Sequence, residues 1–199
     1  MSKTKAKQLW WSRALAGKSK SHLIAYIGVM TALNVVENAY FSISFGTTQF
    51  SLTTFMSILT GILLGPLYGF ASCFIGDFLG YFIGSGSVNS WTPWIGLSTA
   101  MMALLGGLIF NGLSLDRKGA WVFKLGIICA TTFFICTVGI NTTALYLMWY
   151  KKTFDTWWQF LVTRLFFQGQ IFNSLANYAL LFFALPALAK VKPLKIKLQ

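Results

Sequence analysis

Long apolar stretches, separated by brief turn signals, follow one another along the chain from residue 22 onward. About six of them approach the ~20 residues that an α-helix needs to cross the hydrocarbon layer of a membrane. The second and third stretches are short, and only a Gly-Pro turn signal separates them. The pattern predicts an all-α integral membrane protein with six transmembrane helices, at residues 22–44, 50–65, 67–84, 93–112, 121–149 and 157–187.

Composition supports this fold class. Hydrophobic residues make up 56% of the 199 residues and charged residues only 10%, whereas a soluble domain has about a quarter of its residues charged. We expect one membrane domain at residues 22–189, with a basic cytoplasmic segment at 1–21 before it and a basic cytoplasmic tail at 190–199 after it. The first segment has no apolar core, so we expect no cleavable signal peptide.

The basic residues predict how the helices are oriented. Six Lys or Arg lie within the first 20 residues and four lie in Lys190–Lys197. The connections on the opposite side of the membrane are uncharged, except that the last one holds Lys151, Lys152 and Asp155. By the positive-inside rule both termini are predicted to be cytoplasmic, which an even number of crossings permits. The net charge of +12 then reflects topology and contact with anionic lipids rather than nucleic-acid binding.

Glycines recur at intervals of four on the second and third stretches. This spacing leaves one helix face without side chains, so that a neighbouring backbone can approach closely. Packing within the protein is the expected use of both ladders. On the first stretch, Gly28 and Ala32 form a similar pair near the cytoplasmic end, where docking of an external partner helix is as reasonable as internal packing. The two ladders consist of Gly61, Gly65 and Gly69, and of Gly76, Gly80 and Gly84.

Polar residues inside the apolar stretches are predicted to meet at one depth. Polar groups within a bilayer are costly and usually face a cavity or a partner. Counting residues from the end of each stretch puts those of four helices in the outer half of the membrane, and Arg164 and Gln168 on one helix face. The coincidence predicts a ligand pocket open to the outside. The residues at this depth are Asn34, Glu37, Asn38, Asp77, Asn141, Arg164 and Gln168.

Two of these charges have a structural alternative. Glu37 and Arg164 would satisfy each other as an ion pair, which is compatible with lining the pocket. Asp77 is at least as well explained as a hydrogen-bonded structural carboxylate as by contact with a ligand.

Aromatic side chains surround the same depth. An interfacial aromatic belt accounts for many of them, but Trp91 and Trp94 bracket Thr92-Pro93 in the Ser/Gly-rich run GSGSVNSWTPW, which is more typical of a lid. An aromatic pocket with few polar groups suits a large, flat, partly apolar ligand. The candidate ligand-binding residues are Asn34, Glu37, Phe45, Gln49, Trp91, Trp94, Asn141, Trp149, Arg164 and Gln168.

Several functions lack their motif in this sequence. There is no GxxxxGK[ST] loop for ATP, no HExxH, and no cluster of metal ligands. The single histidine, His22, lies at the predicted cytoplasmic edge, away from any catalytic partner. We therefore expect no enzyme, no cofactor and no metal. A channel is disfavoured because the polar residues stop in the outer half, whereas a proton-coupled carrier using Glu37 or Asp77 and a purely structural membrane adaptor both remain open.

The sequence resembles the substrate-binding S components of energy-coupling factor (ECF) vitamin transporters. The resemblance covers nearly the whole chain after the basic N-terminus. Its most specific part is the stretch Phe45–Phe110. Here FSLTTFMSILTGILLGPLYGFASCFIGDFLGYFIGSG, at 50–86, resembles the family's first outer loop, second helix, Gly-Pro turn and third helix. The segment WTPWIGLSTAMMALLGGLIF, at 91–110, resembles the third loop and the fourth helix. Asn141-Thr142 and Arg164 are similar to residues of the folate-specific branch.

The resemblance implies a division of labour. S components capture a vitamin outside a prokaryotic cell membrane and associate with a transmembrane coupling component and two cytoplasmic ATPases. They have six helices and cytoplasmic termini, and the subunit is thought to topple to deliver its ligand. The family docks through an Ala-xxx-Ala motif on the first helix, and Gly28-xxx-Ala32 occupies a comparable place here.

Ligand identity is the least specific part of the resemblance. The loop SGSVNSWTPWIGLST departs from the P-x-G-x-x-F-P-G-F-T pattern of the folate branch, the loop YKKTFDTWW is longer, and Gln168-Gly169-Gln170 replaces the Lys and Pro that tend to follow Arg164. Arg164 is the only buried cation expected in the pocket, which suits a folate poorly. The sequence therefore favours cobalamin or a related corrinoid over folate, with pantothenate and queuosine-type ligands as further alternatives.

Overall fold

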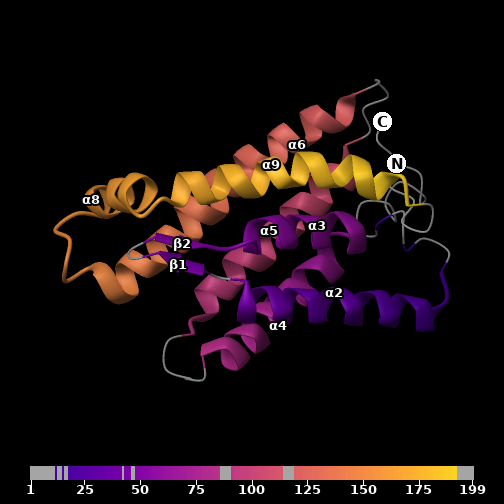
Figure 1. The fold of residues 1–199 in the computed structure, drawn as a ribbon, viewed down its shortest axis with the longest axis horizontal. Helices are drawn as coiled ribbons and strands as arrows, with labels where there is room; N and C mark the ends of the chain where they lie inside the picture. The colour runs from indigo at the N-terminus through magenta and orange to yellow at the C-terminus, as the bar shows by residue number, and fades with distance from the viewer. Residues whose placement is uncertain are drawn as a thin grey trace.

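A computed structural model describes Ser12, Leu15 and residues 18–41, 43–45, 48–85, 91–113 and 119–191. Within these residues the chain forms a bundle of helices with one short β-hairpin near one end (Figure 1). The π-helical segments carry the label η. The elements in chain order are α2 (Lys20–Tyr40), β1 (Ile43–Phe45), β2 (Thr48–Phe50), α3 (Thr53–Leu64), α4 (Pro66–Ser85), α5 (Pro93–Gly112), α6 (Ala120–Thr131), η2 (Thr132–Thr142), α7 (Thr143–Leu145), η3 (Tyr146–Tyr150), α8 (Trp157–Val162), η4 (Thr163–Phe167) and α9 (Gln170–Ala189).

The all-α membrane fold predicted from the sequence is confirmed. Among the described residues, five helical segments are long and apolar enough to cross a membrane: Lys20–Tyr40, Pro66–Gly84, Pro93–Gly112, Ala120–Tyr150 and Gln170–Ala189. The sixth helix is α3, which has 12 residues. Most of α3 is buried, including Ile58 and Leu64 with no exposed surface. The short helix therefore forms the centre of the bundle, and its longer neighbours meet the lipid.

Two predicted spans end differently in the structure. The first was expected to reach residue 44, but α2 ends at Tyr40 and an antiparallel hairpin follows, with Ile43 opposite Phe50. β-Branched and aromatic residues in both strands favour extended backbone over another helical turn. The span expected at 157–187 is also wrong as a single helix, because it breaks at Gly169. Gly169 has a φ of 68°, a left-handed conformation that glycine adopts without steric cost.

The ladder on α3 and the start of α4 packs these helices against each other and against α5. A Cβ added to Gly61 would lie 1.9 Å from the carbonyl oxygen of Ala103, and one on Gly69 would lie 2.7 Å from the Cα of Gly61. Gly65 itself forms the turn between α3 and α4, with a φ of 90°. Two helix backbones are therefore in direct contact at Gly61, as the glycine spacing predicted.

The second ladder packs α4 against α2. Added Cβ atoms on Gly76, Gly80 and Gly84 would lie 2.6, 2.8 and 2.7 Å from atoms of Asn34, Asn38 and Ala39, respectively. Both ladders are thus used for packing within the protein.

The two helix ends that are predicted to be cytoplasmic, the start of α2 and the end of α9, lie together. α2 begins, and α9 ends, at the same end of the bundle, and the hairpin and α8 lie toward the opposite end (Figure 1). This arrangement agrees with an even number of crossings. The residues of the basic segment other than Ser12, Leu15 and 18–21, and those of the tail beyond Val191, lie outside the described residues.

Candidate functional site

A cavity of about 410 Å³ lies among the helices. Its volume is in the range of small-molecule binding sites, roughly 300–1,000 Å³. Every long helix contributes to its wall, so the cavity depends on the whole fold. The lining residues are Asn38, Ser51, Thr53, Thr54, Asp77, Tyr81, Trp91, Ile95, Thr99, Met102, Thr137, Asn141, Leu145, Trp149, Arg164, Gln170 and Asn173.

One end of the cavity is built around the carboxylate of Asp77. Asn38 Nδ2 donates to the Asp77 carbonyl oxygen at 2.9 Å and to Oδ1 at 3.3 Å, and Trp91 Nε1 donates to Oδ2 at 2.9 Å. The Trp91 ring also packs edge-on against Phe74 and Phe78. Asp77 therefore positions the wall residue Trp91 while it lines the cavity, so its structural role and a contact with ligand are compatible.

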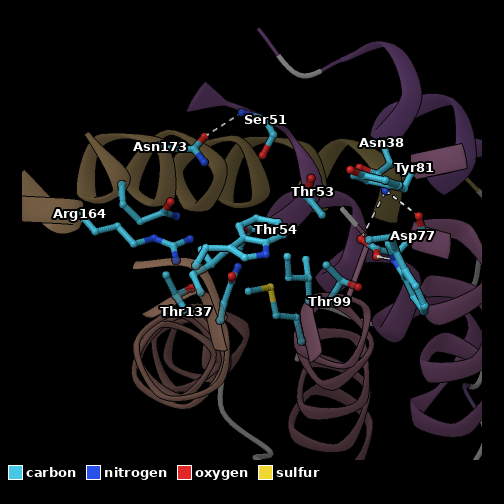
Figure 2. Close-up of a pocket in the computed structure, with 17 residues that line it drawn as sticks. Asn38, Ser51, Thr53, Thr54, Asp77, Tyr81, Thr99, Thr137, Arg164 and Asn173 are labelled. Carbon is cyan, nitrogen blue, oxygen red and sulfur yellow. Dashed lines mark hydrogen bonds between the residues drawn. The ribbon is translucent and has the colours of Figure 1, made fainter. Parts of the chain in front are cut away.

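Arg164 lies on the other side of the cavity from Asp77, with Thr137 close to it (Figure 2). Arg164 is 8% exposed, and its Nη1 has no hydrogen-bond partner among the described residues. The same holds for Thr137 Oγ1 and Asn141 Oδ1, which lie four residues apart on η2. Buried polar atoms without partners are rare, because each costs about 1–3 kcal/mol. We refer to Thr137, Asn141 and Arg164 as the open polar cluster.

The open polar cluster accounts for most of the unpaired atoms. Five buried side-chain nitrogen or oxygen atoms lack a partner in the described part of the chain. Three of these belong to the cluster and line the cavity; the other two, Thr92 Oγ1 and Trp157 Nε1, belong to residues that do not line it. The cluster is also carried by π-helical segments, η2 and η4, and such segments are frequent at functional sites.

Two asparagines of α9 fix the wall that follows the hairpin. Asn177, which is fully buried, donates to the Ser51 carbonyl oxygen at 2.7 Å and accepts from the Phe55 N–H at 2.9 Å. Asn173 accepts from the Ser51 N–H at 3.2 Å, and Figure 2 shows this bond at the edge of the cavity. The start of α3 is therefore tied to the start of α9, although some 120 residues separate them in the chain.

Two predicted site residues serve the scaffold. Asn34 donates to Thr60 Oγ1 at 3.0 Å and does not line the cavity. Glu37 accepts from Thr53 Oγ1 at 3.1 Å and lies behind that lining residue. The structure thus gives Glu37 a partner other than Arg164, and the ion pair considered as an alternative is not formed. Both residues face α3 because α2 turns its polar face toward the core.

The remaining predicted site residues fall into three groups. Four of them line the cavity: Trp91, Asn141, Trp149 and Arg164. Trp94 is 56% exposed and does not line it. Gln168 also does not line it, because the helix ends at Phe167, so that Arg164 and Gln168 do not continue along one face. At Phe45 and Gln49 only the backbone, in β1 and β2, is described.

Sequence reasoning missed the polar face of α9. Gln170 and Asn173 line the cavity and Asn177 holds its wall. Their spacing of three and four residues is that of one helix face, and this signal was present in the sequence. This polar face was not recognised because the last span was treated as one helix starting at Trp157.

The predicted docking pair lies away from the cavity. Gly28 and Ala32 are both exposed on α2, and a Cβ added to Gly28 would meet no atom within 4 Å. This glycine is therefore not used for packing within the protein, unlike those of the two ladders.

Comparison with known proteins agrees with the fold. The sequence model of the family described as "ECF-type riboflavin transporter, S component" matches residues 18–180. The crystal structure of FolT bound with folic acid is similar in fold, with a TM-score of 0.56 and 19% sequence identity over 78% of this chain and 88% of that chain. No curated protein sequence matches the chain.

Proposed function

Because the chain belongs to the family of ECF-type riboflavin transporter S components, we propose that it captures a ring-containing, water-soluble vitamin in the cavity bounded by Asp77 and Arg164. An S component is a substrate-binding membrane subunit, so binding rather than catalysis is its task. The observation that carries the proposal is the open polar cluster. Three buried polar atoms without partners face one cavity, and a bound ligand would satisfy them.

The size of the cavity favours a ligand of the folate or riboflavin class. A fused two- or three-ring heterocycle with one side chain suits a cavity of about 410 Å³. A corrinoid is several times larger, so the cavity volume lends no support to the cobalamin preference drawn from the sequence. The tryptophans Trp91 and Trp149 on the cavity wall supply flat apolar surface for such a ring.

Orientation and partners follow from the same proposal. With both termini in the cytoplasm of a prokaryotic cell, the hairpin end of the bundle faces outward and receives the vitamin. The exposed Gly28-xxx-Ala32 face of α2 would dock a transmembrane coupling component. Two cytoplasmic ATPases would then supply the energy for import.

Calorimetric titration of the purified protein in detergent tests the proposal. We expect riboflavin or folic acid to bind with submicromolar affinity and with one site per chain. Cobinamide and cobalamin are titrated in parallel, and tight corrinoid binding would restore the original preference for cobalamin. If none of these vitamins bound, the capture function itself would be refuted, and uptake into vesicles without ATPases would then test for a carrier.

A further inference from the structure

The buried helix α3 ends inside the bundle. It has 12 residues and is therefore about 18 Å long, well short of the ~30 Å hydrocarbon layer. Its last residue, Leu64, has no exposed surface. A helix leaves its last four carbonyl groups without intrahelical partners, so side chains or water must donate to them. At the end of α3 the protein itself supplies such donors.

Two side chains from distant parts of the chain donate to these carbonyls. The carbonyl of Ile62 would ordinarily accept from the N–H of residue 66, but Pro66 has none. Asn111 Nδ2 donates to it instead, at 3.3 Å. The next carbonyl, that of Leu63, accepts from Ser12 Oγ. Ser12 lies 51 residues away in the chain and is 1% exposed. The basic N-terminal segment therefore contributes to the end of the central helix.

Two further contacts hold this segment against the bundle. Leu15 is 5% exposed and belongs to the same hydrophobic core as Leu63, and its N–H donates to the Ser12 carbonyl oxygen at 3.2 Å. Lys18 Nζ donates to the Tyr26 hydroxyl at 3.2 Å and lies 4.6 Å from the centre of that ring. We refer to Ser12, Leu15 and Lys18 as the strap. The strap fixes the N-terminal segment to α2 and α3.

The other end of α3 forms part of the cavity. Thr53 and Thr54 line it, and Leu63 lies ~13 Å further along the helix axis. Between the two ends, Gly61 is in direct contact with the backbone of Ala103, which leaves no flexible side chain there to absorb a displacement. A shift at the strap end of α3 is therefore passed along the helix to the cavity wall.

We propose that Ser12 is a positioning residue for vitamin binding and acts through α3. The strap, when docked on the Leu63 carbonyl, holds the helix where Thr53 and Thr54 fit the ligand. Vitamin binding then favours the docked strap, and undocking of the strap lowers vitamin affinity. One coupling free energy governs both effects, because linkage between two sites is reciprocal. This inference rests on the proposed function and adds to it a coupled site at the far end of α3.

Labelling of an introduced cysteine measures whether the strap is docked. Ser12→Cys places a thiol at a buried position, and Ser21→Cys, at the exposed start of α2, is the matched control. The unsubstituted protein gives the background reaction of its own cysteines with maleimide. We expect Ser12→Cys to react more slowly than Ser21→Cys. A saturating vitamin, riboflavin or folic acid, should slow Ser12→Cys by a further ~5-fold or more and leave Ser21→Cys unchanged.

Two labelling results would overturn the inference. If Ser12→Cys reacted as fast as Ser21→Cys without vitamin, the strap would not be docked. If a bound vitamin left the rate of Ser12→Cys unchanged, the strap and the cavity would not be coupled.

Titration calorimetry measures the reciprocal effect. Ser12→Ala removes the donor to the Leu63 carbonyl and should weaken vitamin binding by ~3-fold or more, up to the factor by which the vitamin slows labelling. Ser12→Thr keeps a hydroxyl and should restore most of the affinity. Ser21→Ala, at an exposed position, should leave affinity unchanged. A folded Ser12→Ala protein with lowered thermal stability but wild-type affinity would overturn the inference, because Ser12 would then only stabilise the fold.

These outcomes are distinct from failure of the proposed function. If the protein binds riboflavin or folic acid, but neither the labelling of Ser12→Cys nor the affinity of Ser12→Ala shows the coupling, vitamin capture stands and the positioning role falls. If the unsubstituted protein binds neither vitamin, both fall.

Discussion

The helices α2 to α5 and the segments from η2 to α9 satisfy their polar groups in different ways. In α2–α5, glycine ladders bring backbones into contact, and the polar side chains Asn34, Asn38 and Asp77 pair within the protein. In the later segments the helices are π-helical or broken at Gly169, and the open polar cluster lacks partners. Among the described residues, the first half leaves one buried side-chain atom, Thr92 Oγ1, without a partner, whereas the second half contains the open polar cluster, which we propose a ligand completes. Mutations in the two halves should therefore damage different properties.

The largest effect is expected from Gly61→Val. Its Cβ would lie 1.9 Å from the Ala103 carbonyl oxygen, so α3 and α5 must separate and the centre of the bundle opens. We expect a loss of at least ~3–5 kcal/mol in the free energy of unfolding. In size-exclusion chromatography the detergent-solubilised protein should no longer elute as a single symmetric peak.

Gly28→Ala is the matched control for this change. A Cβ at Gly28 meets nothing within 4 Å, so the elution profile and thermal stability should match those of wild type. Equal damage by both changes would mean that glycine on these helices is needed for flexibility rather than for backbone contact.

Arg164→Ala should weaken ligand binding without destabilising the fold. We expect affinity for the captured vitamin to fall by ~10- to 100-fold, because a hydrogen bond to a buried charged group contributes about 1.5–3 kcal/mol. Titration calorimetry measures the affinity. Thermal stability of the ligand-free protein should not fall, since the change removes a buried charge whose Nη1 has no partner. A variant that is unstable without ligand would assign Arg164 to the scaffold instead.

Gly28→Leu should have the opposite effect: it should impair docking to a partner subunit and leave ligand affinity unchanged. A leucine on the exposed face of α2 leaves the cavity untouched, so ligand affinity should equal that of wild type. Docking to a coupling component should be lost if it requires close backbone approach at Gly28-xxx-Ala32. Copurification of the coexpressed subunits measures this. Unchanged copurification would show that docking uses another face of the protein.

The smallest effect is expected from Trp91→Phe. The change removes the hydrogen bond from Nε1 to Asp77 and keeps an aromatic ring against Phe74 and Phe78. A roughly three- to tenfold loss of affinity is expected for one neutral donor. Trp94→Phe, at a 56% exposed position outside the cavity, should change affinity by less. If the two changes had equal effects, the Asp77–Trp91 bond would not position the cavity wall.

Membrane fold and glycine packing were predictable because they depend on local properties of the sequence. Apolar length identifies a span, and intervals of four place Gly61, Gly65 and Gly69 along one helix face. Depth along each span also brought Asp77, Asn141 and Arg164 to one level, and all three line the cavity. Depth does not give rotation about the helix axis, however. Asn34 and Glu37 were therefore expected in the pocket, but they face α3 and bind Thr60 and Thr53.

The sequence by itself determined that this is a helical membrane protein, which helix faces are smooth, and at which depth its polar residues gather. These properties follow from hydropathy and residue spacing, which act along one helix at a time. Only the tertiary structure decided which polar atoms pair with one another and which remain open to a ligand. Pairing depends on the relative rotation of helices and on the break at Gly169, which turns Gln168 out of the cavity wall and brings Gln170 and Asn173 into it.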